Sequence, residues 1–400
     1  MRVPWTAPLL LAASVFAPLA MTASARAEDP MERPLHAFFD SLRKAEDPKA
    51  ARVSKIAYYG DSAIISDGFT GELRSRLQGR FGDAGAGFLL AGPTFDDYRH
   101  QGLKYASKGW SSMAVIAGDV KSGRYGYGGV VATSFGGAAT SFESKGEFIT
   151  SIEVYYEAIP KGGNLQVFLN GETKKSADQI ATAADKPTPR VWRFTPEGGV
   201  KKVRIRAGGE GLVKVYGVVL NGKSKGVQLD ALGILGMRAR RWLNADADHV
   251  RDQVATRSPD LVVLHFGGNE RVDENLSKAG HQADIEKTVA LLKAGAPHAA
   301  CLIVGPLAQG EEKGGKIVYD KSLDDIYPAQ REAAKRAGCA FFDTLAAMGG
   351  KSALASWRKN KWLEGDYAHL TAKGHKALGD LMAKWMLGLY DTWKTHTASR

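Results

Sequence analysis

The sequence predicts an α/β fold, a parallel sheet covered by helices, into which an all-β module is inserted. Strand-like and helical stretches alternate near residues 53–81 and again after residue 226. Between about residues 95 and 225 the helical periodicity is absent, and short alternating runs are separated by glycine-rich turns. Because the first strand–helix unit precedes this β-rich stretch and the others follow it, we predict that the β module interrupts the α/β domain.

These changes of pattern define the expected domain limits. We assign residues 28–94 and 226–400 to one discontinuous α/β domain, and residues 95–225 to a β-sandwich or jelly-roll module. Of the 400 residues, 44% are hydrophobic, enough for a substantial core. Several aromatic residues of the module suit a sugar-stacking platform, but for each we favour a place in the core: Trp110, Tyr125, Tyr127, Trp192 and Tyr216.

The first 27 residues have the composition of a secretory signal peptide. Arg2 precedes a short apolar core, and Ala25-Arg26-Ala27 forms a small-x-small cleavage site. This core is short and interrupted by prolines, so we favour a cleaved signal over an uncleaved anchor. We therefore predict a periplasmic or secreted protein with no stable membrane span after cleavage.

The formal net charge of +11 indicates the class of partner. A surplus of surface lysine is one explanation, and attraction to an acidic polymer is the other. No nucleic-acid-binding motif is present, and an exported protein rarely meets nucleic acid. Anionic envelope glycans are the better candidates.

The two cysteines, Cys301 and Cys339, each precede a strand-like run. They exclude a disulfide scaffold and a cysteine-rich metal site. A disulfide forms only if the two strands are neighbours, and two buried free thiols are an equal alternative.

Polar residues lie at three predicted strand ends. Ser62 follows the apolar run that begins at Ile56, and Asn269 follows the buried strand over residues 260–266. Asp366 and His369 come just before the last helix. Open α/β sheets bind their ligands at the carboxyl ends of the strands, so we expect these groups to converge.

Together these residue types fit a serine hydrolase. We expect Ser62 as the nucleophile, His369 as the general base and Asp366 as the group that orients the imidazole. The backbone N–H groups of Ser62 and Gly236 and the side-chain amide of Asn269 are the expected oxyanion hole. The histidines show no metal-binding spacing, and we predict neither a metal nor another cofactor.

Each of these residues also has a purely structural alternative. Asn269 suits an Asx turn, Asp366 suits a helix cap, and His369 suits a solvated loop. Two further histidines compete for the role of base, but we expect His265 to be a core residue in a strand and His375 to lie on the last helix.

Gly60-Asp61-Ser62, Gly236, Gly267-x-Asn269 and Asp366-x-x-His369 together resemble the block pattern of the SGNH (GDSL-type) hydrolase family. The resemblance covers about residues 53–92 and 227–390. It implies a flavodoxin-like three-layer fold and metal-independent ester hydrolysis by a serine mechanism. Gly233 competes with Gly236 for the second block, and Glu270 stands where the family more often has Asp.

A narrower resemblance comes from the residues after the serine. The run Asp67-Gly68-Phe69-Thr70-Gly71-Glu72-Leu73 and the inserted β module look like those of Gram-negative peptidoglycan O-acetylesterases, whose module resembles a carbohydrate-binding domain. Ala63 departs from the His that those relatives often have.

We therefore expect an exported acetylesterase whose partner is an O-acetylated glycan, with peptidoglycan favoured. An O-acetyltransferase and a non-catalytic glycan-binding protein are the alternatives. A lipase or thioesterase is less favoured, because the sequence has no conspicuous apolar lid segment.

Overall fold

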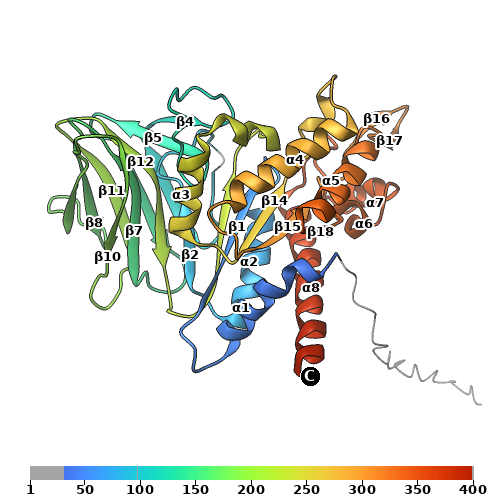
Figure 1. Ribbon diagram of the computed structural model, residues 1–400, viewed down its shortest axis with the longest axis horizontal. Coiled ribbons are helices and arrows are strands. Elements are labelled where there is room, and N and C mark those ends of the chain that lie inside the picture. The colour runs from blue at the N-terminus through green and yellow to red at the C-terminus, as the bar shows by residue number, and fades with distance from the viewer. Residues whose placement is uncertain (1–30, 97, 399–400) are drawn as a thin grey trace, which may run out of the picture.

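A computed structural model describes residues 31–96 and 98–398 (Figure 1). The predicted signal peptide lies outside these residues. An α/β part and a β-rich part lie side by side, and the chain passes from the first to the second and back. None of the described helices is both long and apolar enough to cross a membrane.

The α/β part is built on a five-stranded parallel sheet with the strand order β13-β1-β14-β15-β18. The strands are β1 (Val53–Gly60), β13 (Gly226–Gly233), β14 (Leu261–His265), β15 (Ala300–Val304) and β18 (Ala340–Phe342). Numbered along the chain, this is the 2-1-3-4-5 order of flavodoxin-like folds. The predicted fold class is confirmed.

Helices cover both faces of this sheet. One face carries α1 (His36–Glu46), α2 (Gly68–Phe81), α6 (Thr344–Met348), α7 (Ala353–Lys359) and α8 (Ala372–Ala398). The other carries α3 (Ala247–Arg257), α4 (Lys278–Lys293) and α5 (Leu323–Ala337). In β1, Ile56 and Tyr58 pack on the first face, and Ala57 and Tyr59 pack on the second, as the strand alternation requires.

Side-chain caps fix where several helices begin. The Asp246 carboxylate accepts from the backbone N–H of His249 at the start of α3, and Ser277 accepts from Gly280 at the start of α4. Such caps satisfy N–H groups that have no partner within the helix.

The β-rich part is a sandwich of two antiparallel sheets around its own apolar core. One sheet has the order β10-β7-β12-β5-β4, with β2 also paired to β12, and the other has the order β3-β6-β11-β8-β9. The strands are β2 (Gly85–Leu89), β3 (Leu103–Lys108), β4 (Ser111–Ala114), β5 (Val130–Ser134), β6 (Ala139–Ser144), β7 (Ser151–Ala158), β8 (Asn164–Leu169), β9 (Asp178–Ala181), β10 (Thr188–Phe194), β11 (Lys202–Gly209) and β12 (Val213–Asn221).

The module's aromatic residues lie mainly in the core. Tyr125, Tyr127 and Tyr216 are almost fully buried, as expected, whereas Trp110 and Trp192 are half-buried. Strand β2 pairs with β12, although it precedes residue 95. The exact domain limits stay predictions.

A buried ion pair lies where the α/β part and the β-rich part meet. The guanidinium of Arg257, at the end of α3, donates to both carboxylate oxygens of Asp230 on β13, at 2.8 and 3.0 Å. Asp230 also accepts from the backbone N–H of Phe88 on β2, at 2.7 Å. One carboxylate therefore links the parallel sheet, α3 and the first strand of the sandwich.

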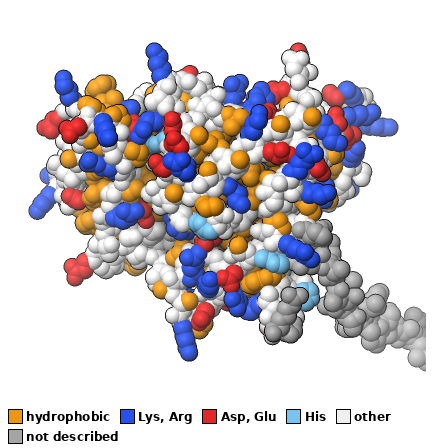
Figure 2. Space-filling view, viewed as in Figure 1, with side chains coloured by type: hydrophobic (Ala, Val, Ile, Leu, Met, Phe, Trp, Pro, Cys, Tyr) orange, Lys and Arg blue, Asp and Glu red, His pale blue; other side chains and the backbone are white. Residues whose placement is uncertain are grey.

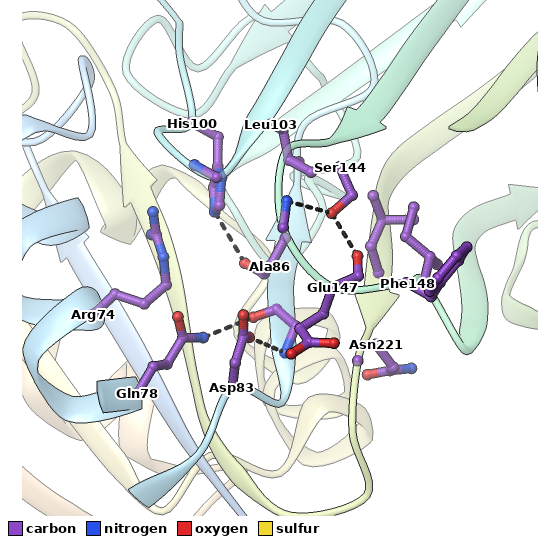
Figure 3. Close-up of a pocket in the computed structure, with 16 residues that line it drawn as sticks. Arg74, Gln78, Asp83, Ala86, His100, Leu103, Ser144, Glu147, Phe148 and Asn221 are labelled. Atoms are coloured by element: carbon purple, nitrogen blue, oxygen red, sulfur yellow. Dashed lines mark hydrogen bonds between the residues drawn. The ribbon is translucent and has the colours of Figure 1, made fainter. Parts of the chain in front are cut away.

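A pocket lies at the junction of α2, β2 and the module's loops (Figure 3), beside the beginning of β13. Several of its polar side chains bond to the backbone. Gln78 donates to the Gly85 carbonyl at 3.1 Å, Asp83 accepts from the Gly85 N–H at 2.8 Å, and His100 lies 3.2 Å from the Ala86 carbonyl. These bonds hold the junction together.

The two cysteines form a disulfide. Cys301 lies in β15 and Cys339 immediately precedes β18, and these two strands are neighbours in the sheet. The alternative of two free thiols is wrong.

We predict that Arg257→Met lowers the free energy of unfolding by about 3–5 kcal/mol, because it leaves the Asp230 charge buried and uncompensated. Thermal and denaturant unfolding measure the loss. Arg251→Met is the matched control, since Arg251 lies on the same helix in exposed ion pairs and should matter little.

The double variant Arg257→Met/Asp230→Asn should recover much of the loss, because no charge is then left buried and the introduced amide oxygen still accepts from the Phe88 N–H. If Arg257→Met destabilises no more than Arg251→Met, the ion pair does not have this role.

Candidate active site

The register of the sheet brings the predicted site segments to one edge. Gly60, the last residue of β1, lies beside Gly233 on one side and His265 on the other. The segments that follow these three strands therefore begin at the same level. Ser62 and Asn269 lie on two of them, as predicted from the sequence.

Ser62, His369 and Asp366 form a continuous chain of hydrogen bonds. The Ser62 hydroxyl lies 3.1 Å from Nε2 of His369, and Nδ1 of His369 lies 2.6 Å from a carboxylate oxygen of Asp366. With Nδ1–H donating to the carboxylate, Nε2 is left to accept the serine proton. This arrangement is the one that activates a serine hydroxyl as a nucleophile.

The surroundings of Asp366 keep it ionised. Burial alone would raise its pKa, but hydrogen bonds from the side chain and backbone of His369 and from the Ala368 N–H lower the pKa of Asp366 to about 2. Both backbone bonds measure 3.0 Å. A permanent negative charge on Asp366 would stabilise an imidazolium at His369.

Tyr367, between Asp366 and the histidine, has a left-handed backbone with φ of 56°. Its hydroxyl donates to Glu312 at 2.6 Å, and its carbonyl accepts from the Gly310 N–H at 2.9 Å. Gly310 and Glu312 belong to a hairpin of β16 (Gly310–Lys313) and β17 (Lys316–Tyr319). The hairpin thus holds the Asp366–His369 turn in a conformation that is unfavourable for tyrosine.

Asn269 lies in the site, but its amide is already engaged. It donates to the Met237 carbonyl at 3.0 Å and to the Asp61 carboxylate at 3.3 Å. To donate to an oxyanion, Asn269 has to release one of these bonds, and the longer bond to Asp61 is the weaker one.

Gly236 lies in a turn just after β13, closed by a 3.1 Å bond from the Met237 N–H to the Ile234 carbonyl. Its φ of 71° favours glycine. Gly233 is glycine for a different reason, since a Cβ there would lie 2.8 Å from Ile64. Gly236 is not among the described residues that line the cavity beside Ser62, and its oxyanion role stays a prediction.

Two buried carboxyl groups lie under the site. Burial raises the pKa of Asp61 to about 6 and the pKa of Glu270 to about 7. Glu270 accepts from the backbone N–H groups of Ala239 and Gly267, at 2.9 and 3.0 Å. It therefore ties the segment after β13 to the segment after β14, which accounts for a carboxylate at this position.

The cavity beside Ser62 has an empty volume of about 420 Å³, including the part open to solvent. It is lined by the polar residues Asp61, Ser62, His265, Asn269, Arg271, Gln309 and His369, and by Ala63, Pro306, Leu307, Gly268 and Ala368. Sequence analysis missed Arg271 and Gln309. Their positions in the sequence could have indicated them. Arg271 lies two residues after Asn269, and Gln309 follows β15 at the same edge of the sheet.

The two histidines that compete for the role of base, His265 and His375, are buried, as expected. Burial lowers the pKa of His265 to about 3, and its Nδ1 lies 3.2 Å from the Tyr58 hydroxyl. His375 is buried on α8, and burial lowers its pKa to about 4. Among the described residues, no three His, Cys, Asp or Glu side chains are grouped to hold a metal ion.

Comparison with known families identifies the domain that carries this site. Residues 205–377 match the model of the GDSL-like Lipase/Acylhydrolase family. The chain carries a GDSL-like acylhydrolase domain. The match includes Asn269, Asp366 and His369 but begins within the inserted module, so it does not include Ser62, which the insertion separates from the rest of the domain.

A solved structure shows the same fold over nearly the whole chain. A structure of a peptidoglycan O-acetylesterase is 23% identical, with a TM-score of 0.74, and the alignment covers 92% of this chain and 97% of that one. A lipase/acylhydrolase from Enterococcus faecalis is 17% identical with a TM-score of 0.31, over 41% of this chain and 77% of that one. No curated protein sequence matches the chain.

These findings confirm the predicted SGNH-type ester hydrolase with an inserted β module. They do not test the roles of single residues in the acylhydrolase. Ser62, His369, Asp366, Asn269 and Gly236 therefore keep the roles predicted for them from the sequence.

We predict that Asp61→Asn flattens the pH dependence of stability of the acylhydrolase. The pKa of Asp61 is higher in the folded than in the unfolded chain, so its contribution is fully present below about pH 4 and is lost as the pH rises through about 6. Relative to the variant, the wild type should lose up to about 3 kcal/mol between pH 4 and 7.

Denaturant unfolding at several pH values measures this difference. Asp252→Asn, at an exposed position on α3, is the control and should leave the profile unchanged. A wild type whose stability relative to Asp61→Asn rises with pH would contradict the assignment.

Proposed function

We propose that this chain is an exported serine acetylesterase that removes O-acetyl groups from an envelope glycan, with peptidoglycan as the substrate. The observation that carries the proposal is the hydrogen-bonded series Ser62–His369–Asp366 within an acylhydrolase domain. Acyl transfer from an ester needs a nucleophile, a base and a group that orients the base, and these three side chains have the required geometry.

In the proposed mechanism, Ser62 Oγ attacks the ester carbonyl while His369 Nε2 takes its proton. The oxyanion is stabilised by the backbone N–H groups of Ser62 and Gly236 and by the amide of Asn269. His369 then protonates the ester oxygen of the sugar as its bond to the acyl carbon breaks, so the sugar leaves with a free hydroxyl and the acetyl group stays on Ser62. Water, deprotonated by His369, attacks the acetyl-serine and releases acetate.

The apolar part of the cavity supports a short acyl group. Its lining side chains are small or medium-sized: Ala63, Pro306, Leu307 and Ala368. Side chains of this size favour acetyl over long-chain esters.

Solvent access favours hydrolysis over transfer. The side chains of Asp366 and His369 are 51% and 49% exposed, so water reaches the base directly. A transferase has to keep water away from its acyl-enzyme. The complete triad likewise favours a catalytic role over that of a glycan-binding protein.

Three observations support the envelope assignment. The amino-terminal sequence has the pattern of a secretory signal, the disulfide suits an oxidising compartment, and the known peptidoglycan O-acetylesterase has the same fold over nearly the whole chain. We propose a periplasmic or secreted location in a Gram-negative envelope.

The net positive charge of the chain would attract acidic polymers in general. On the face seen in Figure 2, Lys and Arg side chains are interspersed with Asp and Glu, and no single basic patch dominates. Long-range attraction of this kind raises the encounter rate without selecting a particular sugar. Selection therefore has to come from the cavity itself.

We predict that the mature protein releases acetate from O-acetylated peptidoglycan and that Ser62→Ala lowers kcat/KM by at least about a thousandfold. Ser66→Ala, in the same turn, is the matched control and should retain activity. Xylan acetate and a small aryl acetate are the comparison substrates.

Turnover of the aryl ester alone would keep the serine mechanism and exclude peptidoglycan. Acetyl transfer to an added glycan would instead identify a transferase. Absence of any turnover that depends on Ser62 would overturn the proposal.

A further inference from the structure

We propose that Gln309 and Arg271 bind the acetamido group of an N-acetylated amino sugar beside the ester that is cleaved. This inference rests on the proposed function and names the sugar class that the site selects. Glycans that carry a hydroxyl in place of the acetamido group, such as xylan or cellulose derivatives, would be poorer substrates.

The side-chain amide of Gln309 is buried in the wall of the cavity without a partner. The residue is only 7% exposed, and Oε1 has no hydrogen bond to any described residue. An unpaired buried polar group costs about 1–3 kcal/mol, so its persistence at a cavity wall indicates that a ligand satisfies it.

The backbone around Gln309 is fixed on both sides. The Gln309 carbonyl accepts from the Asp320 N–H at 2.9 Å, and the next residue, Gly310, donates to the Tyr367 carbonyl at 2.9 Å. The amide lies against Gly268, where an added Cβ would come 2.9 Å from Nε2 and 3.5 Å from the Asp61 carboxylate. Gln309 is thus held between the catalytic turn and the segment that carries Asn269.

Arg271 offers further donors to the same cavity. Its Nη1 pairs with Asp320 at 2.6 Å, and its side chain is 26% exposed. Its Nε is buried without a partner among the described residues. Asp320 neutralises the guanidinium, so the site suits a neutral hydrogen-bonding group better than a second carboxylate.

An acetamido group has the complementary chemistry. It presents one N–H donor and one carbonyl acceptor, and its methyl group is small. Because the N–H and the carbonyl of a trans acetamide point in opposite directions, Gln309 Oε1 would accept from the N–H while Arg271 donates to the carbonyl. A hydroxyl carries its donor and its acceptors on one oxygen next to the sugar ring, so it does not place them where the acetamido N–H and carbonyl lie. Sites built for such bonds discriminate strongly against analogues that lack them.

Two substrates with the same ester test the inference: 6-O-acetylated chitotriose and 6-O-acetylated cellotriose. They differ in having acetamido or hydroxyl groups at the 2-positions. We expect the wild type to prefer the chitotriose ester by at least about tenfold in kcat/KM. Gln309→Leu should reduce this preference to within about threefold.

Gln309→Met retains the length of the side chain and serves as the second variant, because it loses the acceptor and should also weaken the preference. Glu311→Gln, on the same hairpin, is the matched control, since Glu311 is exposed and pairs with Lys313. The control should keep the wild-type preference.

Binding gives a measurement that is independent of turnover. Calorimetry on Ser62→Ala should show that chitotriose with its acetamido groups but no O-acetyl group binds at least about tenfold more tightly than cellotriose, and adding Gln309→Leu should remove the difference. Equal binding of the two sugars, or a kinetic preference that survives in both Gln309 variants, would overturn the inference.

The two proposals fail separately. Hydrolysis of both trisaccharide esters that depends on Ser62 but shows no preference would leave the esterase intact and reject the acetamido site. Selective binding of chitotriose without any Ser62-dependent hydrolysis would support the acetamido site and reject the esterase.

Discussion

The active site depends on the register of β1 between its two neighbours. Gly60 lies level with Gly233 and His265, so the segments after three different strands start at one height. Packing enforces this register, because successive residues of β1 face opposite helix layers and a slip of one position would exchange them. The apolar core therefore sets the distance between Ser62 and the segment that carries Asn269.

Above the sheet, the loops hold one another in place through polar contacts. Asp273 pairs with Arg238 and Arg240, which joins the segment after β14 to the segment after β13. Arg271 pairs with Asp320 of the chain that leaves the hairpin, and the hairpin in turn bonds to Tyr367. These contacts connect the loops beside the cavity in series, from the segment after β13 to the turn that carries His369.

The sequence was most informative where local pattern decides the structure. Alternating strands and helices predicted the α/β fold with its insertion, and polar residues at strand ends predicted the candidate site residues Ser62, Asn269, Asp366 and His369. What it could not reveal depends on contacts between distant segments. The disulfide required knowing that β15 and β18 are neighbours. The bond from Asn269 to Asp61 and the left-handed backbone of Tyr367 likewise result from the way separate loops meet.

Gln309 was overlooked because glutamine near a strand end is common, and only its burial without a partner distinguishes it.

The position of β2 has a consequence for how such a chain can change during evolution. β13 is the outermost strand of the parallel sheet, and β2 packs along it while bonding to Asp230 through Phe88. A deletion that removed the sandwich would expose the edge strand β13 to solvent, together with Tyr59 and its apolar neighbours. Bare sheet rims recruit strands from other molecules and lead to aggregation. The inserted module thus protects the edge of the sheet from aggregation. A related protein could lose the module during evolution only if charged residues first appeared along β13.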